Sequence, residues 1–497
     1  MIKLETIKAP FSSGWNHIDA LLDTGPGWNW LTPVRTVLYY SFSVTEGTDP
    51  KSSGVTGTLS SFNLAQQNAV RDILKSINQI TGISFAEVSD GKKADLHFAN
   101  ANITNANNAG LTQWTFNYSY DASQTITTYL AQAYVYVDNA ESGTRYLSPV
   151  AGNYAYELLM HEIGHAMGLK HPFEGGVVLP SAEDNTDFSL MSYTQKDIHS
   201  VYGAYDIAAL KWLYGGDGLG GNLGVGSQGK YLLATSNDDV IQASLGNDVI
   251  DGQLGKDTLR YSGNRSQYVL TPSADGLAVI GKEGKDTVLN IEEIRFSDMH
   301  VNLLVQSYAK TLSTSDVSRI EELYLAFFNR VPDSDGLAYW LTQFKSGASL
   351  AQISDAFYGA GISFSSITGY TKDMSDQAFV NLVYKNVLGR SEGADTEGLI
   401  YWTTALAAGR ETHGSLVNTI LNSAHSFKGD IQFGWVADLL DNKIAVAHSF
   451  AVRAGLSYNT DADSISSGMK IAAAVTSSGI DAALKLIGIN ADQFNLA

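Results

Sequence analysis

The sequence YAYELLMHEIGHAMGLKHPF, residues 154–173, places three of the chain's ten histidines and a glutamate close together. In a helix, residues four positions apart lie on one face, so His161 and His165 can reach a single ion. Gly168 permits a sharp backbone turn where a side chain would obstruct it, and this turn brings His171 back as a third ligand. Three neutral imidazoles leave a fourth position open for water, which is typical of a catalytic rather than a structural zinc site.

Glu162 follows His161 directly and is expected to lie beside a metal-bound water without being a ligand itself. A zinc ion lowers the pKa of its water toward neutrality. Glu162 can then take the proton as the hydroxide attacks a carbonyl, and can pass it to the leaving amine. The alternative interpretation is a helix whose histidines are simply buried or solvated. Gly168 and His171 make that alternative the weaker one, because they complete a ligand set.

The motif HEIGHAMGLKH, followed by SLMSY at residues 189–193, resembles the metzincin zinc peptidases and in particular the serralysin group. The segments HIDALL (17–22), VLYYSFSV (37–44) and YDIAALKWLYGGD (205–217) extend this resemblance over the first half of the chain. The resemblance implies three zinc ligands, a general base, a methionine in a tight turn under the zinc, and a tyrosine that can swing to stabilise the oxyanion. These are, in that order, His161, His165, His171, Glu162, Met191 and Tyr193.

Residues 1–215 have the pattern of a mixed α and β domain. Strands are expected at RTVLYYSFSV (35–44), ADLHFAN (94–100) and QAYVYVD (132–138). A helix is expected within residues 63–82, with Asn63 and Gln66 as a capping box and Gly82 as its end. The strand QAYVYVD is expected to offer an exposed edge to the backbone of an extended peptide.

A nine-residue repeat, TSNDDVIQA, SLGNDVIDG and QLGKDTLRY, covers residues 235–261. Glycine and aspartate in register at this period are typical of a parallel β-roll that binds calcium. The repeat resembles the repeats-in-toxin module of serralysins, so residues 216–305 are expected to form a small roll with about one to three calcium ions. The expected calcium residues include a detached copy near residue 286 and are Asp239, Asp248, Asp257, Gly246, Gly255 and Asp286. Glycine-rich hairpins without an ion are the alternative.

Residues 306–497 are expected to be helical and contain a longer repeat, LYLAFFNRVPDSDGLAYW (323–340) and LVYKNVLGRSEGADTEGLIYW (382–402). It resembles a helical domain of unassigned function at the ends of exported bacterial proteins, including surface-layer-associated ones. Its aromatic residues are expected to be core: Phe327, Phe328, Tyr339, Trp340, Tyr401 and Trp402. Its acidic residues are expected to be caps and turns rather than ligands: Asp333, Asp335, Glu392 and Asp395.

The formal net charge of −19 argues against nucleic acid or an anionic membrane as a partner, because both require clustered lysine and arginine. The chain has no cysteine, which excludes disulfides and thiolate ligands. No apolar run has the length of a membrane span or of an N-terminal signal peptide.

Calcium sites of the repeat type are weak, so they fill outside the cell. Chains with such repeats resemble substrates of one-step (type I) bacterial export, and DQFNLA (492–497) is similar to the uncleaved C-terminal signals of that route. The sequence therefore predicts a secreted, extracellular protein. The helical part could anchor it at a cell surface or surface layer, dimerise, or assist export.

Together these patterns predict a multidomain chain with an α+β metzincin catalytic domain, a parallel β-roll and an all-α C-terminal domain. The first hypothesis is a secreted zinc endopeptidase that acts on proteins or peptides. The second is a calcium-dependent surface or adhesion protein with a vestigial protease domain. The third is hydrolysis of a non-peptide amide. The presence of Glu162 and of all three histidines favours the first over the second.

Overall fold

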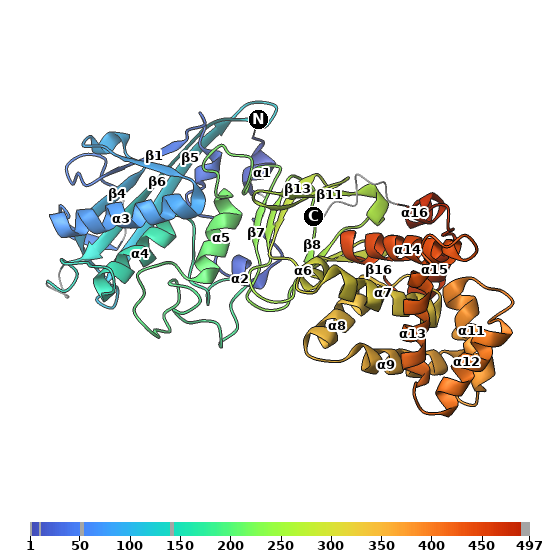
Figure 1. Cartoon of the computed structure of the whole chain (residues 1–497). Coiled ribbons are helices and arrows are strands. Elements are labelled where there is room, and N and C mark those ends of the chain that lie inside the picture. Colours follow the sequence, from blue (N-terminus) through green and yellow to red (C-terminus); the bar gives the residue numbers. More distant parts are fainter. Residues whose placement is uncertain (1, 9–10, 50–53, 140–143, 489–497) are drawn as a thin grey trace. The chain divides into compact units, whose positions relative to one another are not determined.

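The computed structural model describes residues 2–8, 11–49, 54–139 and 144–488 (Figure 1). The expected export signal at residues 492–497 lies outside these described residues. Within them, no helix combines the length and the apolar character that crossing a bilayer requires.

The chain divides into two compact units. The first comprises Met1–Thr235 and Leu245–Gln253, and the second comprises Ser236–Ser244 and Leu254–Ala497. The boundary runs through the nine-residue repeats, because successive repeats belong to different units. The division into three domains expected from the sequence stays a prediction.

The first unit is built on a six-stranded sheet with strand order β3-β1-β4-β6-β5, and β2 pairs with β4 off this path. β1 is parallel to β3 and β4, and β4 is parallel to β6, whereas β5 is antiparallel to β6. Within the described residues β5 is therefore a terminal strand. The strands are β1 Val37–Ser41, β2 Val55–Ser60, β3 Ser84–Glu87, β4 Leu96–Ile103, β5 Gly110–Tyr120 and β6 Ile126–Asp138.

The expectation that QAYVYVD (132–138) forms an exposed edge is wrong. This segment is the end of β6, which pairs with β4 on one side and with β5 on the other. The alternation of apolar residues identifies a strand but carries no information on the order of strands in the sheet. The edge belongs to β5, which the sequence patterns did not single out.

α3 Leu64–Thr81 and α4 Tyr154–Ala166 lie against one face of this sheet, and α5 Ala204–Tyr214 packs against α3 (Figure 1). The predicted capping box of α3 is confirmed, because the Asn63 side chain accepts from Gln66 N–H and the Gln66 side chain accepts from Asn63 N–H. Gly82 ends the helix in the left-handed region at φ 73°. Short helical segments precede and separate these elements: α1 Leu4–Lys8, α2 Asn16–Asp19, η1 Trp28–Trp30 and η2 Gly91–Lys93.

The two faces of the sheet have different neighbours. On the helical face, Gln66 of α3 donates to Asn100 of β4 at 2.7 Å. On the opposite face, Leu111 of β5 packs with Tyr134 and Tyr136 of β6. Because side chains alternate along a strand, Thr112 and every second residue after it point to the helical face.

The nine-residue repeats form short parallel strand pairs. In the first unit β7 (Tyr231–Leu233) is parallel to β9 (Val249–Asp251), and in the second β8 (Val240–Gln242) is parallel to β10 (Thr258–Arg260). Each pair joins residues two repeats apart in the sequence, as the register Val240 to Thr258 illustrates.

The rest of the second unit contains further strands and a group of helices. β8 and β10 belong to a five-stranded sheet with the order β16-β15-β14-β10-β8. β12 pairs in the antiparallel sense with β11 and with β13. These strands are β11 Val269–Ser273, β12 Gly276–Ile280, β13 Lys285–Leu289, β14 Glu293–Arg295, β15 Met299–Asn302 and β16 Leu456–Tyr458, and η3 Arg265–Gln267 precedes β11.

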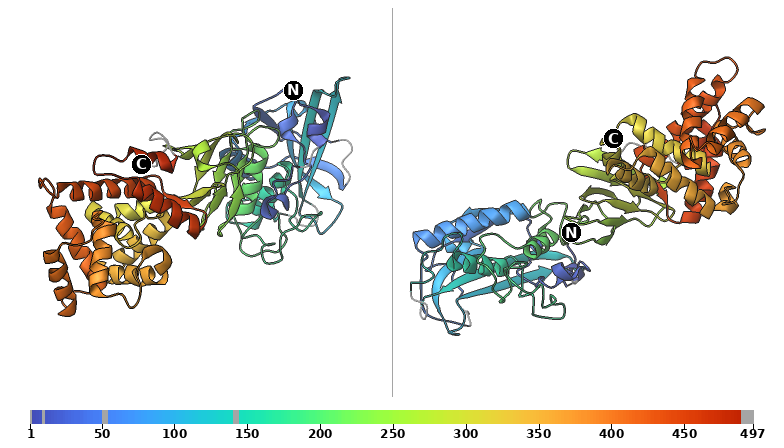
Figure 2. Two further views of the ribbon diagram at one scale, coloured as in Figure 1. Left: turned by 90° about the vertical axis from the view of Figure 1, so that its right-hand side faces the viewer. Right: turned by 60° about the horizontal axis from the view of Figure 1, so that its bottom comes forward.

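Figure 2 shows the helices of the second unit, coloured yellow to red, gathered into one cluster. A single core of leucine, valine and aromatic side chains joins most of them. They are α6 Val305–Lys310, α7 Thr314–Phe328, α8 Ser334–Lys345, α9 Leu350–Ser363, α10 Ser365–Thr368, α11 Asp376–Leu388, α12 Thr396–Ala407, α13 His413–Ser426, α14 Gly434–His448, the π-helical turn η4 Ser449–Arg453, α15 Asp461–Ala473 and α16 Asp481–Ile487.

The longer sequence repeat corresponds to two helix pairs, α7 with α8 and α11 with α12. In the first pair the N-cap Asp333 accepts from Gly336 N–H, and in the second the N-cap Asp395 accepts from Gly398 N–H. A Cβ atom at Gly398 would lie 2.9 Å from the Tyr384 hydroxyl oxygen, so glycine is required for this close approach. The repeated motif therefore encodes a helix start, and the expected role of Asp333 and Asp395 as caps is confirmed.

The expectation that every aromatic residue of the repeat is core is partly wrong. Phe327 and Trp402 are buried, but Tyr339 and Tyr401 are 56% and 60% exposed. Neighbouring residues on a helix point about 100° apart, so only one member of each Tyr-Trp pair can face the core.

We predict that Asp395→Ala lowers the free energy of unfolding of the helical region by about 1 kcal/mol, because one N–H at the start of α12 loses its acceptor. Chemical denaturation of the full chain followed by tryptophan fluorescence measures this. The matched control is Glu392→Ala, an exposed acidic residue just before the same helix, which should change stability by less than about 0.5 kcal/mol. Equal losses in both variants would contradict the assignment.

Candidate metal centre

α4 presents two histidines to the same side of the cleft. Asn153 caps the helix by accepting from Tyr156 N–H at 2.9 Å. His161 and His165 lie one turn apart near the end of α4, and the chain then turns at Gly168, whose φ is +95°. Residues with a side chain rarely adopt this φ, so glycine permits the turn that was expected from the sequence. The turn brings His171 against the two helical histidines.

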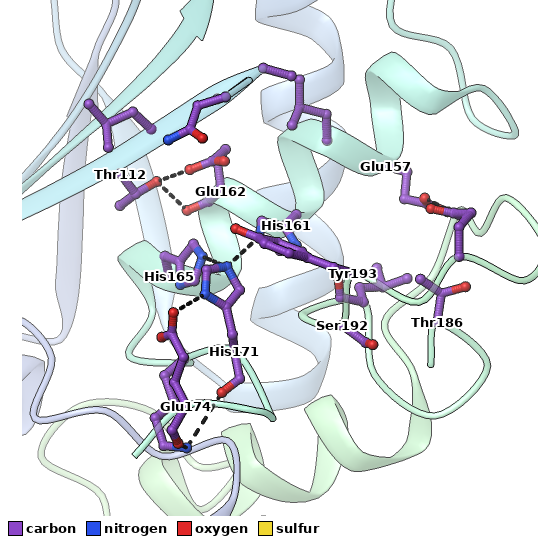
Figure 3. A pocket seen from close by; sticks show the side chains of 18 of the residues that line it. Thr112, Glu157, His161, Glu162, His165, His171, Glu174, Thr186, Ser192 and Tyr193 are labelled. Carbon is purple, nitrogen blue, oxygen red and sulfur yellow. Dashed lines mark hydrogen bonds and ion pairs between the residues drawn. The ribbon is translucent and has the colours of Figure 1, made fainter. Parts of the chain in front are cut away.

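The imidazole nitrogens of the three histidines converge (Figure 3). His171 Nε2 lies 3.3 Å from His161 Nε2 and 3.1 Å from His165 Nε2. In the described part of the chain, this is the single group of three or more histidine, aspartate or glutamate side chains whose ligand atoms lie within 4.8 Å of one another.

Each imidazole is oriented through its other nitrogen. His161 Nδ1 lies 2.7 Å from the Leu190 carbonyl oxygen, and His165 Nδ1 lies 2.8 Å from the Leu169 carbonyl oxygen. A carbonyl can only accept, so both Nδ1 atoms carry the proton and both Nε2 atoms present a lone pair. At His171 the carboxylate of Glu174 lies 2.9 Å from Nδ1 and favours the same tautomer.

The three residues fit a zinc ion. Lone pairs that face one another at such short range repel unless a cation lies among them. Nitrogens bound to a tetrahedral zinc ion at about 2.1 Å stand about 3.4 Å apart, close to the separations of 3.3 and 3.1 Å. Burial lowers the pKa of His161 to about 4 and, with the neighbouring imidazoles, lowers that of His165 well below its ordinary value. Both are therefore neutral at pH 7, which is the form that binds metal.

Glu162 lies in the same cleft and is held from β5. The Thr112 hydroxyl lies 2.7 Å from Glu162 Oε2 and 2.8 Å from the Glu162 carbonyl oxygen. Gly110 passes close to this side chain, because a Cβ atom there would lie 2.5 Å from Glu162 Oε1. Burial raises the pKa of Glu162 to about 7, and the hydrogen bond from Thr112 opposes the rise. A cation at the histidines would oppose it too, since positive charge favours the carboxylate.

A tight turn containing Met191 supports the histidines from below. Met191 is fully buried under α4, where a Cβ atom at Gly164 would lie 2.7 Å from the methionine sulfur. The buried carboxylate of Asp206, on α5, accepts from Ser189 Oγ at 2.6 Å and from Leu190 N–H at 2.8 Å. Asp206 therefore fixes the residue whose carbonyl orients His161.

Tyr193 lies at the mouth of the cleft. Its side chain is 68% exposed, and its ring centroid lies 4.5 Å from that of His171 and 6.0 Å from that of His161. The cleft has a volume of about 620 Å³, and its wall also includes Trp114 and Tyr154. The structure thus brings together all six residues that the sequence analysis assigned to the zinc site.

Sequence reasoning missed Thr112, Gly110 and Asp206. Thr112 and Gly110 contact the site from β5 and Asp206 contacts it from α5, and none belongs to a spacing pattern that a sequence can reveal. Thr112 follows Gly110 by two positions, the alternation of a strand, but nothing in that pair points to Glu162 fifty residues later.

The expected calcium residues are distributed over several turns and strands. The Asp248 side chain accepts from Lys230 N–H, and the Asp257 side chain accepts from Asp239 N–H, both at 2.8 Å. Each carboxylate thus holds the turn two repeats earlier. Asp286 lies on β13, where its carboxylate accepts from the Tyr261 hydroxyl at 2.7 Å.

Glycines shape these turns. Gly246 and Gly255 have φ of +130° and +126°, and a Cβ atom at either would lie within 2.4 Å of a carbonyl oxygen in the turn two repeats earlier. The repeated glycines therefore permit a close stacking of successive turns.

Comparison with protein families gives two matches. The model described as Matrixin, a peptidase family, matches residues 56–206, which run from β2 to the start of α5. The model for a domain of unknown function, DUF4214, matches twice, at residues 302–361 and 362–428. Each of these two copies contains one of the repeated helix pairs described above.

Curated relatives agree with the first match. The chain is 30% identical to Serralysin G of Dickeya chrysanthemi over 169 residues, which are 31% of this chain and 34% of that protein. It is 27% identical to Metalloprotease AprA of Pseudomonas entomophila over 217 residues, 39% of this chain and 42% of that protein. For Serralysin of Proteus mirabilis the identity is 29% over 216 residues, 36% and 41% of the two chains.

The matches thus span less than half the length of each of these relatives. The Matrixin match at residues 56–206 covers the part of the chain that carries the three histidines and Glu162. This part of the chain is therefore similar to the Matrixin peptidases, and the chain shares stretches of sequence with serralysins.

Proposed function

We propose that the chain is a zinc-dependent endopeptidase with His161, His165 and His171 as the zinc ligands and Glu162 as the general base. The observation that carries this proposal is the convergence of three imidazole lone pairs beside a buried glutamate, in a cleft bordered by a sheet edge. Imidazole ligands alone would also suit a structural metal site. The buried carboxylate next to them is the group that peptide hydrolysis additionally requires.

We assign each residue of the cleft a separate role in the hydrolysis. A zinc ion held by the three histidines would polarise the scissile carbonyl and lower the pKa of an attacking water. Thr112 fixes Glu162 Oε2, so we assign Oε1 to accept the proton of that water and to deliver it to the leaving amine nitrogen. The Tyr193 hydroxyl at the mouth can donate a hydrogen bond to the negatively charged oxygen that forms from the carbonyl.

The sheet edge supports an extended polypeptide as the substrate. β5 is the terminal strand and passes Glu162 at Gly110 and Thr112. A substrate strand can pair with the backbone of β5 and bring one of its carbonyls to the metal centre. A small non-peptide amide has no extended backbone that could pair with this strand. We therefore propose protein or peptide substrates.

We further propose that β7, β8, β9 and β10 belong to a short parallel β-roll that binds calcium. The parallel pairing of strands two repeats apart supports this, as do the left-handed glycines in the turns. Turns of this kind can offer carbonyl and carboxylate oxygens, the ligands that calcium prefers. The proposed calcium residues are Asp239, Asp248, Asp257, Gly246, Gly255 and Asp286.

Export is the remaining part of the proposal. Weak calcium sites would be empty in a cytosol and filled outside the cell, so calcium would stabilise the chain after type I export. We propose a secreted enzyme whose two DUF4214 copies attach it to a cell surface or surface layer. The competing hypothesis, a calcium-dependent adhesion protein with a vestigial protease domain, predicts zinc binding without hydrolysis.

The first test is casein hydrolysis by the full chain with zinc and calcium, with EDTA, and with both metals restored. We predict that EDTA abolishes hydrolysis and that restoring the metals recovers it. Glu162→Ala should bind zinc and lose roughly 10²- to 10⁴-fold in rate, because the proton acceptor is missing. Glu46→Ala, which removes an exposed glutamate of the same unit, should keep the wild-type rate. A zinc-loaded wild type that cleaves nothing would favour the adhesion hypothesis.

The second test is thermal unfolding of the full chain with and without millimolar calcium. Calcium should raise the midpoint, because an ion that binds only the folded state stabilises it by up to about 2.7 kcal/mol at a hundredfold excess over Kd. The double variant Asp248→Asn, Asp257→Asn should lose this rise and retain wild-type zinc affinity. Equal calcium shifts in both proteins would contradict the proposed sites.

A further inference from the structure

A row of aromatic rings leads away from the metal centre along β5. Trp114, Phe116, Tyr118 and Tyr120 occupy alternate positions of the strand. Successive ring centroids are 6.0, 6.2 and 6.3 Å apart, and the first three rings are stacked. Phe116 and Tyr120 of this row are exposed to solvent, so packing in the protein core does not account for them.

The row shares a face with the catalytic residues. Side chains alternate along a strand, so the aromatic residues point to the same side as Thr112, which contacts Glu162. Their cross-strand partners agree with this, because Thr112 lies opposite Val135 and Phe116 lies opposite Ala131 on the same face of β6. The row therefore begins at the cleft, whose wall includes Trp114, and continues beyond it along β5.

A second cavity of about 620 Å³ lies over the middle of the row. Its wall is largely apolar and includes Phe11, Trp30, Phe116, Tyr118, Tyr129 and Val177. Asp23 lines both this cavity and the catalytic cleft, so the two are neighbours on one surface. We refer to this second cavity as the aromatic hollow.

Phe116 is positioned to receive a ligand. Its ring stacks on the buried Tyr129 at 5.8 Å with an interplanar angle of 5°, yet 41% of its side chain is exposed. One side of the ring is thus supported by the protein. Val177, which also lines the hollow, is 43% exposed. Apolar side chains that are held in place but remain open to solvent commonly mark a binding surface.

We propose that the aromatic hollow binds an apolar or aromatic side chain of the polypeptide substrate, on the N-terminal side of the bond that is cut. This inference rests on the proposed peptidase function. A strand added to β5 in the antiparallel sense continues the pairing that β5 makes with β6. Such a substrate runs from the Tyr120 end of β5 toward Gly110, so residues over the hollow precede the scissile bond.

The distance along the strand gives the position of that side chain. Phe116 and Tyr118 follow Thr112, the strand residue beside Glu162, by four and six positions. At about 3.4 Å per residue these positions lie roughly 14 to 20 Å from the catalytic glutamate. The substrate residue in the hollow should therefore be about the fourth to sixth before the cleaved bond.

The test uses peptides of one sequence around the cleaved bond, with phenylalanine placed at the fourth, fifth or sixth position before it, or with serine at all three. Binding is measured by fluorescence anisotropy to the zinc-loaded Glu162→Ala chain, so no cleavage is needed. The same background also carries Phe116→Ser or, as the matched control, Asn117→Ser. Asn117 is the exposed neighbour of Phe116 on the opposite face of β5.

We expect one phenylalanine peptide to bind roughly tenfold more tightly than the serine peptide, since its ring gains an aromatic contact in the hollow. Phe116→Ser should remove this difference, and Asn117→Ser should retain it. Equal affinity for all peptides in the Glu162→Ala chain, or the same loss in both variants, would overturn the proposal. The expected binding pattern without any hydrolysis by the chain that retains Glu162 would support the hollow and overturn the peptidase function.

Discussion

Polar contacts at the Nδ1 atoms fix the orientation of the imidazole rings of His161, His165 and His171. The Leu190 and Leu169 carbonyls and the Glu174 carboxylate lie at the Nδ1 atoms, so three Nε2 lone pairs meet within a few ångströms. Such an arrangement is unfavourable without a cation, and surrounding elements must hold it. Asp206 does so by anchoring Leu190 from α5, and the turn at Gly168 does so by returning His171 to α4.

The local part of this arrangement could be predicted from the sequence, because it follows from helical spacing and from one glycine. His161, His165 and Gly168 are separated by intervals that determine their geometry whatever surrounds them. The capping box of α3 was predictable for the same reason. Thr112 and Asp206 were not, because their contacts with the site join distant segments. The sheet edge was assigned to β6 rather than β5, since alternation of apolar residues does not specify strand order.

The two kinds of repeat differ in what their sequences reveal. In the helical repeat, the aspartate cap and the glycine under a tyrosine hydroxyl explain the motif through contacts within one helix pair. The exposure of Tyr339 and Tyr401 was unpredictable from the motif, because it depends on which helix face the core covers. In the nine-residue repeat, Asp248 and Asp257 each accept a backbone N–H from the turn two repeats earlier, and this contact is visible only in the folded chain.

X-ray absorption at the zinc edge, on the full chain reconstituted with zinc, determines whether His161, His165 and His171 hold one zinc ion. We expect one zinc ion per chain at these histidines, with three imidazole nitrogens at about 2.0–2.1 Å and one oxygen ligand. The spectrum of His171→Ala should show one imidazole fewer. A zinc ion without imidazole ligands, or a spectrum unchanged in His171→Ala, would show that the three histidines are not the zinc ligands.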